Sequence, residues 1–400
     1  MVNLLAKAQS INCKNIIKKM KEFSIVFIKE SKEFFEMLDF IEMFEEISID
    51  MEADGFYAYK AKPCLWQLCV EDESKKYAFL VDPILWKEDS LVPMHNIFGN
   101  DQILKIFHGS EYDFQMIYET YNIIPKNVED TKIAADLLGC PSPGLDTLLN
   151  DFLEIRVNKS KRLQRANWAK RPLSDELIDY AALDVLHLKD LREKLVKELE
   201  EKDRLKWYLE ECSIYQNLTP VIQSETTKEH SHKIKGAKKL SKSQLAILET
   251  LFETRESICR KKNLASFRLI GNQQLLDIAK NYEAYEDVFP KKMDFKIKKK
   301  FIKAIKFMKS SEKPLPVFSP PKKKKYKKGP DHLTKAIREM RLKKSKKLNM
   351  LPGVLLPARI LNAIALCNPK NLKELQNVHG IRKWQVELLG ESILNAIAKV

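Results

Sequence analysis

The segment SIDMEADG, residues 48–55, alternates between apolar and acidic side chains and therefore predicts a β-strand. Strand side chains point to opposite faces with a period of two. Ile49 and Met51 would share one face. Asp50 and Glu52 would share the other, about 7 Å apart along the strand. Neighbouring carboxylates repel each other, so this face is either a solvated strand surface or part of a cation-binding site.

Composition places the 400-residue chain among globular proteins, with 44% hydrophobic and 31% charged residues and room for two or three domains. The net charge of +15 is unevenly spread, because residues 1–200 carry −9 and residues 201–400 carry +24. A strongly basic half predicts a polyanionic partner whose phosphates supply affinity. The acidic half would approach such a partner only with its carboxylates covered by cations.

The seven cysteines are odd in number and include no C-x-x-C pair, which favours a reducing compartment over a disulfide framework or a structural zinc site. No apolar run approaches the ~20 residues of a membrane span. Residues 1–21 contain lysines but neither acids nor arginine, so they match a transit peptide only weakly, and a start at Met20 is the alternative. We expect a cytoplasmic monomer that does not bind membranes.

Apolar periodicity predicts strands interleaved with helices. Strands are expected at 24–29, 47–53, 64–71, 76–82 and 102–109. Helices are expected at 31–44, 110–121, 129–139 (with Asp130 as N-cap and Gly139 as its end), 144–153 and, as one long helix capped by Ser174, 174–200. The polar stretch before residue 76 indicates a hairpin. This order predicts an α/β domain over residues 22–212, a mixed sheet flanked by helices.

The second half of the chain predicts two helical modules, over residues 241–310 and 351–400. Residues 213–240 are polar and weakly patterned, and residues 311–350 are rich in Pro and Lys, so both are expected to be linkers. The lysine run at 322–328 is a nuclear import signal, a solvated linker or an RNA tether, and the last two readings are favoured.

Two further acids stand in places that need an explanation. Asp113 lies in the first turn of a predicted helix, where it either complements the helix dipole or serves a site. Asp184 lies on the apolar stripe of its helix, together with Leu177 and Tyr180. A buried carboxylate costs several kcal/mol unless it is paired or bound to a metal.

Clustered carboxylates suit hard cations such as Mg²⁺ or Mn²⁺. Two such ions roughly 3.5–4 Å apart activate a water and stabilise the leaving oxygen in phosphodiester cleavage. Candidate ligands of a site with two divalent ions are Asp50, Glu52, Asp113 and Asp184. The hydroxyl of Tyr180, one helical turn before Asp184, would lie near them.

Three segments together resemble the exonuclease motifs of the ribonuclease D family, in the DEDD superfamily. They are DMEADGFYAYKAKPCLWQL at 50–68, FHGSEYDFQMIY at 107–118 and NWAKRPLSDELIDYAALDVLHL at 167–188. The Tyr four residues before the last Asp resembles the Tyr subtype. The resemblance implies an RNase H-like fold and a metal-dependent 3′–5′ exoribonuclease that trims tRNA precursors and other small structured RNAs, releasing 5′-mononucleotides. A DNA exonuclease and a non-catalytic RNA-binding scaffold are the alternatives.

The same resemblance implies a role for each acid. Asp50 would bridge both ions, Glu52 and Asp184 would complete one site, and Asp113 would support the second. Tyr180 would orient the attacking water. Its hydroxyl has an ordinary pKa near 10, so it suits hydrogen bonding better than strong base catalysis at pH 7.

Residues that contact the RNA are less clearly indicated. Many relatives have Phe directly after the first Glu, where this chain has Ala53, and Phe56 or Tyr57 would then stack on the terminal base. Four other candidates either bind RNA or have structural roles. They are Gln67, His108, Trp168 and Arg171.

Residues 241–310 and 351–400 resemble two HRDC domains, helical modules that would bind structured RNA. The segment NLKELQNVHGIRKWQVELLGESIL at 371–394 is the clearest match, with Gly380 expected to close one helix before the next begins. The first module departs from the pattern, because GNQQLLDIA at 271–279 lacks the Asp that often precedes the second helix.

Overall fold

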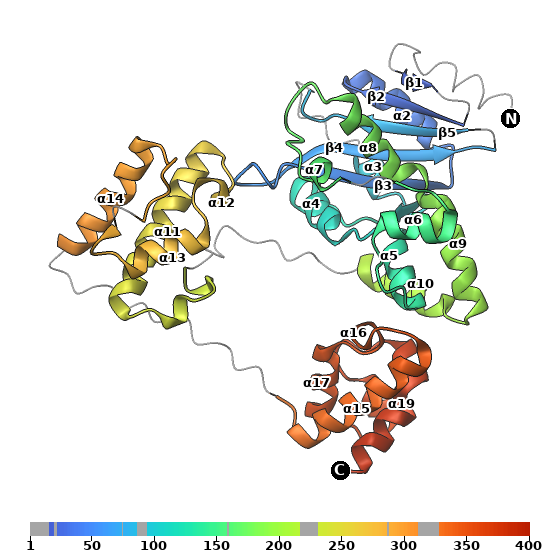
Figure 1. Cartoon of the computed structure of the whole chain (residues 1–400). Helices are drawn as coiled ribbons and strands as arrows, with labels where there is room; N and C mark the ends of the chain where they lie inside the picture. The colour runs from blue at the N-terminus through green and yellow to red at the C-terminus, as the bar shows by residue number, and fades with distance from the viewer. Residues whose placement is uncertain are drawn as a thin grey trace. The chain divides into compact units, whose positions relative to one another are not determined.

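The computed structural model describes residues 16–19, 22–73, 75–85, 94–157, 160–216, 231–285, 288–310 and 328–400. These residues divide into two units (Figure 1). The first unit contains the described residues up to Glu52, those from Pro63 to Gln216, and those from Lys328 onward. The second contains the loop Ala53–Lys62 and the described residues 231–310.

A seven-stranded sheet forms the centre of the first unit, with strand order β1-β2-β5-β4-β3-β6-β7 (Figure 1). The strands are β1 Ile16–Lys19, β2 Phe23–Ile28, β3 Glu46–Ala53, β4 Pro63–Glu71, β5 Lys76–Val81, β6 Leu104–Phe107 and β7 Val128–Asp130. β1 pairs with β2, and β4 with β5, in antiparallel fashion, whereas the pairs β2–β5, β3–β6 and β6–β7 are parallel. The prediction of a mixed sheet, including the β4–β5 hairpin, is confirmed.

Helices cover the sheet because its strands are apolar on both faces. In β5, Ala78 and Leu80 belong to the core that includes the helices α8 and α9. The alternate residues Tyr77 and Phe79 meet Phe40 of α2, with ring centroids 5.2 and 6.0 Å apart. The helices of this domain are α2 Ser31–Ile41, α3 Met94–Phe98, α4 Glu111–Tyr121, α5 Thr131–Leu138, α6 Leu145–Leu153, α7 Lys161–Gln164, α8 Asp175–Leu186, α9 Leu188–Glu201 and α10 Leu205–Gln216.

The long helix predicted over 174–200 is wrong, because the chain turns at His187 between α8 and α9. His187 has φ −122° and ψ 8°, outside the helical range. Lys76 of β5 donates to the carbonyl of Leu186 at 3.1 Å, which occupies an acceptor at the end of α8. By contrast, α5 is capped as predicted: the Asp130 carboxylate accepts from its first turn, and Gly139 ends it at φ 85°.

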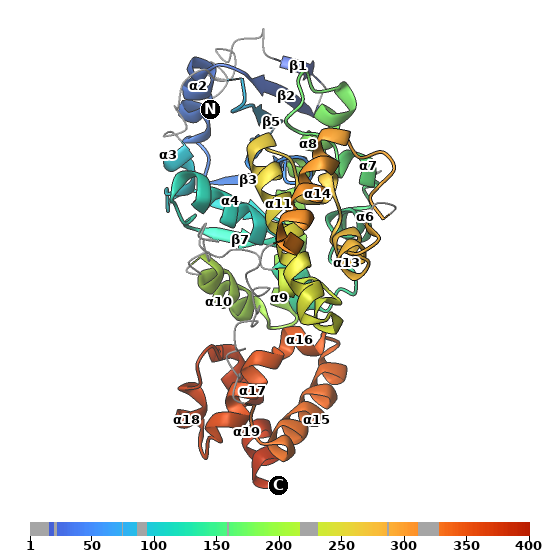
Figure 2. The ribbon, with the colours of Figure 1, turned by 90° about the vertical axis from the view of Figure 1, so that its left-hand side faces the viewer.

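The C-terminal helical module begins earlier than predicted. It consists of α15 Asp331–Leu348, α16 Pro352–Leu355, α17 Ala358–Cys367, α18 Leu372–Gln376 and α19 Lys383–Ala398, drawn in orange and red in Figure 2. The predicted linker over 311–350 is wrong from residue 331, because Leu333 and Ile337 of α15 are buried in the module. Gly380 has φ 86° but lies in the α18–α19 loop, and Asn377 caps α18 instead.

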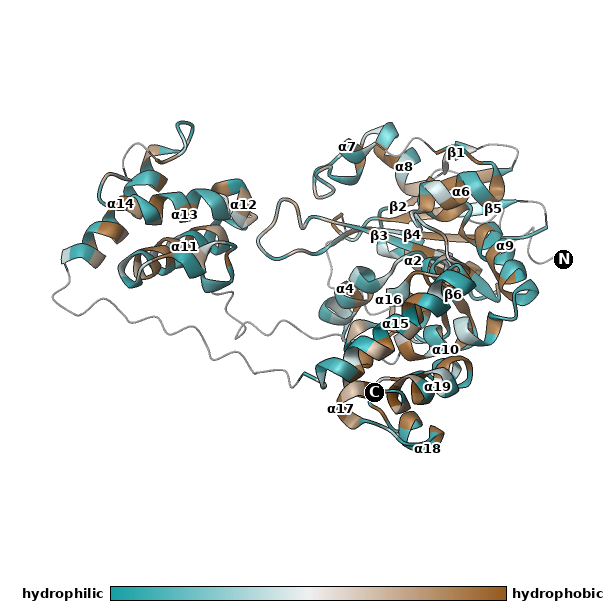
Figure 3. Cartoon of the chain, turned by 60° about the horizontal axis from the view of Figure 1, so that its bottom comes forward, coloured by the Kyte–Doolittle hydropathy of each residue, from teal (hydrophilic) through white to brown (hydrophobic). Residues whose placement is uncertain are grey.

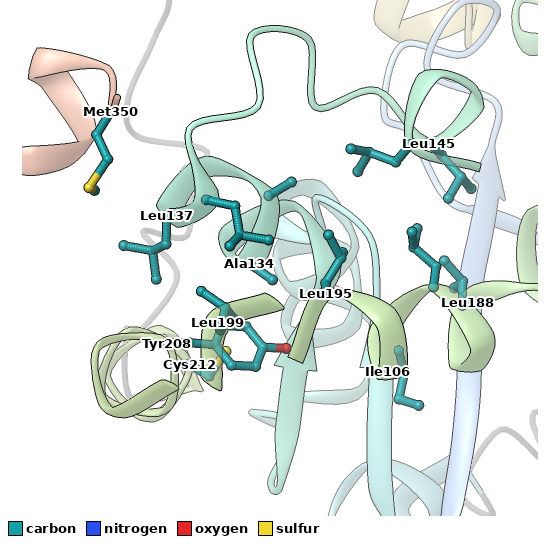
Figure 4. Packing of buried hydrophobic residues seen from close by; sticks show 14 of the residues in the cluster. Ile106, Ala134, Leu137, Leu145, Leu188, Leu195, Leu199, Tyr208, Cys212 and Met350 are labelled. Atoms are coloured by element: carbon teal, nitrogen blue, oxygen red, sulfur yellow. The ribbon is translucent and has the colours of Figure 1, made fainter. Parts of the chain in front are cut away.

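The core of the C-terminal module is continuous with that of the α/β domain. Met350 and Leu137 belong to one buried cluster, part of which is shown in Figure 4. Trp384 of α19 stacks on Trp207 of α10, with centroids 4.9 Å apart. Glu210 of α10 accepts from the backbone N–H of Trp384 at 3.0 Å, at the start of α19. Aromatic stacking and helix capping therefore join the module to the domain.

The second unit is helical, as predicted for residues 241–310. Its elements are η2 Ser231–Lys233, η3 Ala237–Lys239, α11 Lys242–Lys262, α12 Ser266–Leu269, α13 Asn272–Lys280 and α14 Phe295–Ser310. Ile234 and Ala237 are buried in its core, so the linker predicted over 213–240 is wrong from residue 231. α14 alternates apolar and lysine-rich surface (Figure 3). Across the described residues of both units, no helix has the length and hydropathy that a membrane span requires.

Candidate active site

β3 presents its two acids as the alternation predicts. Ile49 and Met51 are buried, while Asp50 and Glu52 are half-buried on the opposite face. These two acids lie at the carboxyl end of the strand.

The neighbouring strand β6 brings a helix to the same edge of the sheet. β3 and β6 are parallel, with Ser48 opposite Ile106. Continuing that register by two residues places Asp50 level with His108, just before α4 begins. The acids of β3 and the first turn of α4 therefore share one edge.

Tyr180 and Asp184 lie one turn apart on α8, and both are buried. The pKa of Tyr180 is raised above its ordinary value, first by burial and then by the charges of Asp184, Glu52 and Asp50. Because the Coulomb energy falls with distance, these contributions indicate that the acids of β3 and α8 lie in the same region as Tyr180. The hydroxyl stays protonated at neutral pH and can donate a hydrogen bond.

Asp146 contributes a fourth negative charge to the surroundings of Tyr180. It lies in the first turn of α6 and is exposed. Sequence reasoning missed it, because an acid in the first turn of a helix is ordinary.

Asp113 lies in the first turn of α4, as predicted, and is buried there. Burial and the negative charge of Asp130 raise its pKa to about 7. Asp130 also fixes the turn before α4, accepting from the backbone N–H groups of Gly109 and Ser110 at 2.8 and 2.9 Å. The sequence identified Asp130 only as a helix cap, but its second role positions Asp113.

The donor set can be compared with what a hard cation needs. Among the described residues, no group of three or more His, Cys, Asp or Glu side chains is arranged to hold a metal ion. The chemistry of the side chains nevertheless fits such an ion. Asp50, Glu52 and Asp184 all place negative charge near Tyr180, and carboxylate oxygens are the ligands that Mg²⁺ and Mn²⁺ prefer.

Trp168 and Arg171 occupy structural positions. Trp168 is fully buried, and its ring centroid lies 6.0 Å from that of Tyr180. Arg171 donates to the carboxylate of Asp82 and to the carbonyl of Cys64, each at 2.8 Å. These contacts favour the packing role over RNA contact, and they reveal Asp82 as a buried anchor that sequence reasoning missed.

His108 and Gln67 are also held by the protein. His108 Nδ1 lies 2.9 Å from the hydroxyl of Thr131, which itself donates to the carbonyl of Phe107. Gln67 is fully buried in β4 and donates to the carbonyl of Leu65 at 3.4 Å. The contact with Thr131 favours a structural role for His108, whereas Gln67 Oε1 is buried without a hydrogen-bond partner among the described residues, and RNA contact at either residue stays a prediction.

Family comparisons assign both the α/β domain and the C-terminal module. Residues 25–200 match the family model described as 3′-5′ exonuclease. This segment is therefore similar in sequence to 3′–5′ exonuclease domains. Residues 331–397 match the HRDC domain model, which agrees with the position of α15 rather than with a boundary at residue 351.

Relatives and solved structures extend this match. The chain is 29% identical to ribonuclease D of Jannaschia sp. strain CCS1 over 234 residues, or 58% of this chain and 59% of that protein. It thus spans little more than half of that relative. Ribonuclease D of Pseudomonas paraeruginosa is 27% identical over 363 residues, covering 87% of this chain and 90% of that protein. The crystal structure of Escherichia coli RNase D has a TM-score of 0.63 at 22% identity, covering 93% of this chain and 98% of that chain, and supports the fold.

Phe56 and Tyr57 follow the exonuclease strand β3 but belong to the second unit. Phe56 packs edge-on against Phe267 of α12, with centroids 6.4 Å apart. Arg268 lies 3.6 Å from the ring centroid of Tyr57. Both candidates for base stacking thus contact residues of the helical module.

Proposed function

We propose that this protein is a metal-dependent 3′–5′ exoribonuclease that trims tRNA precursors and other small structured RNAs and releases 5′-mononucleotides. The observation that carries the proposal is the pair Asp50 and Glu52 at the carboxyl end of β3 together with a buried Asp184 one helical turn from Tyr180 on α8. The 3′-5′ exonuclease domain and the similarity to ribonuclease D support it. The Escherichia coli structure is that of an exoribonuclease involved in structured RNA processing.

The four acids would hold two divalent ions, Mg²⁺ or Mn²⁺. Asp50, Glu52 and Asp184 supply carboxylates near Tyr180, and Asp113 supplies one from the same edge of the sheet. Bound divalent ions supply activation of the attacking water and stabilisation of the leaving oxygen. The four carboxylates determine where the cations would bind. Asp130 holds the turn that precedes α4, the helix that carries Asp113.

Tyr180 would act as a hydrogen-bond donor, as in the Tyr subtype of this superfamily. Its raised pKa keeps the proton on the hydroxyl, and its ring is fixed by Trp168. A protonated, immobile hydroxyl can orient a water or a phosphate oxygen without serving as the base.

The helical modules would bind the body of the RNA, with the protein acting as a monomer. The second unit, with α11, α13 and α14 around a single core, would be a second HRDC domain beside the one at 331–397. Its last helix carries lysines at many exposed positions, which suits phosphate contacts that weaken with salt.

A direct test uses a tRNA with a 3′ extension, labelled at its 5′ end, and a DNA strand of matched sequence. With Mg²⁺ or Mn²⁺, we expect stepwise shortening of the RNA from its 3′ end, release of 5′-mononucleotides and slower loss of the DNA. Faster loss of the DNA would favour a DNA exonuclease. Tight RNA binding without shortening in either metal would contradict the proposal and favour a scaffold.

A further inference from the structure

The loop that leaves β3 is built into the helical second unit. The backbone N–H of Ala265 donates to the carbonyl of Tyr57 at 2.8 Å, and that of Tyr59 donates to the side chain of Asn263 at 3.1 Å. Asp54 closes the loop on itself by accepting from the backbone N–H of Lys62 at 2.9 Å. Residues 53–62 are therefore held by the connection between α11 and α12.

Aromatic rings and guanidinium groups meet at this junction. Arg268 lies 3.6 Å from the ring centroid of Tyr57, and its Nε donates to the carbonyl of Phe56. Arg260 lies 5.7 Å from the ring centroid of Tyr59. Each tyrosine of the loop is thus paired with an arginine of the module.

Two phenylalanines in mutual contact remain open to solvent at the same place. Phe56 is 45% exposed and Phe267 is 57% exposed, although their centroids are only 6.4 Å apart. Exposing two apolar rings at one place costs free energy in water, and such exposed apolar patches mark interaction sites.

The charge around these rings indicates what they bind. The loop and the α11–α12 region expose six cationic side chains, beside one half-buried acid, Glu256. The six are Lys60, Lys62, Arg260, Lys261, Lys262 and Arg268. Surfaces that combine aromatic rings with cations suit single-stranded nucleic acid, whose bases stack while its phosphates pair with Lys and Arg. An apolar protein partner would not call for so many cations.

We propose that Phe56, Tyr57, Phe267 and Arg268 form a stacking platform for unpaired nucleotides of RNA. The choice of RNA rests on the proposed function. Because Ala53 follows Glu52 directly, the platform loop is covalently tied to the strand that carries two of the proposed metal ligands. The loop after β3 contributes Phe56 and Tyr57 to this platform, and the first helical module contributes Phe267 and Arg268.

The test measures binding without cleavage. The full-length protein is titrated in EDTA against a fluorescent single-stranded oligoribonucleotide. We expect Phe267→Leu to weaken binding at least about fivefold, since stacking of one base is lost. Phe267→Tyr keeps the ring and should stay within about twofold of wild type. Phe295→Leu is the matched control, because Phe295 is 76% exposed on α14 and should also stay within about twofold.

Equal binding by wild type and Phe267→Leu would overturn the platform, as would equal losses in Phe267→Tyr and Phe267→Leu. If wild type binds no more tightly than Phe267→Leu even at low salt, the exposed rings do not bind RNA, and a protein partner becomes the favoured occupant. Failure of the proposed function looks different: the oligoribonucleotide would bind through Phe267, but no RNA would be shortened when metal is restored.

Discussion

Gly139, at the end of α5, lies directly against the backbone carbonyl of Asn349, which follows α15. A β-carbon at Gly139 would stand 1.7 Å from that carbonyl oxygen, and Gly139 has φ 85°, where side chains are strained. Arg204 adds to the same junction by donating to the carbonyls of Leu137 and Leu348 at 2.7 and 2.8 Å. The C-terminal module is thus joined to the α/β domain at a position that only glycine allows.

Gly139→Ala should therefore loosen this junction. We expect the thermal unfolding midpoint of the full-length protein to fall by about 2–8 °C, because both the contact and the backbone conformation are strained. Gly353→Ala is the control, since a β-carbon there would meet nothing within 4 Å. Its midpoint should be unchanged or higher, and equal losses in the two variants would contradict this view of the junction.

Removing the guanidinium of Arg171 should be costly. Arg171→Met leaves the fully buried carboxylate of Asp82 without its cation, so the free energy of unfolding should fall by about 3–5 kcal/mol. In the exposed Arg162–Glu176 pair, Arg162→Gln should cost at most about 1 kcal/mol. Urea titrations of both variants measure the difference. Losses of similar size would show that Asp82 is not a buried anchor.

Tyr180→Phe tests the hydroxyl near the acids. We expect kcat on RNA to fall about 10²-fold or more while KM changes little, because the donor that orients the water or phosphate is lost. Tyr121→Phe also removes a buried hydroxyl, one that accepts from Trp66 Nε1 at 2.9 Å, and should lower stability without this loss of kcat. A Tyr180→Phe enzyme with wild-type kcat would remove Tyr180 from the reaction.

Lys105 should give the stability a measurable pH dependence. It is fully buried, and burial lowers its pKa to about 8, whereas the unfolded chain keeps that proton up to about pH 10.4. In that window the unfolded state binds more protons, so stability from this site rises with pH. Between pH 8 and 9.5, the free energy of unfolding of wild type should gain about 1.5 kcal/mol relative to Lys105→Met. Parallel pH curves for the two proteins would contradict this.

The sequence predicted those features that depend on neighbouring residues alone. The alternation around Asp50 and Glu52 fixed the faces of β3, and Asp130 and Gly139 marked the ends of α5. The break at His187 could not be predicted, because it accompanies a hydrogen bond from a lysine more than a hundred residues away.

Contacts between distant segments explain the other differences. Asp130 acts on Asp113 through a turn that no sequence pattern marks, and Asp82 pairs with Arg171, 89 residues further along the chain. The sequence did not predict that the C-terminal module begins at α15. This helix is rich in lysine and has few buried apolar positions, such as Ile337, so its apolar periodicity is weak. The site roles of the four acids remain predictions.

The most direct measurement of the central claim is trimming of a 3′-extended tRNA by Asp184→Asn and Asp179→Asn. Both substitutions lie on α8, but Asp184 is buried and one turn from Tyr180, whereas Asp179 is half-exposed and paired with Lys18 at 2.8 Å. The account predicts at least a 10²-fold loss of trimming for Asp184→Asn, abolition of wild-type trimming by EDTA, and near wild-type activity for Asp179→Asn. Undiminished trimming by folded Asp184→Asn, or by wild type in EDTA, would contradict it.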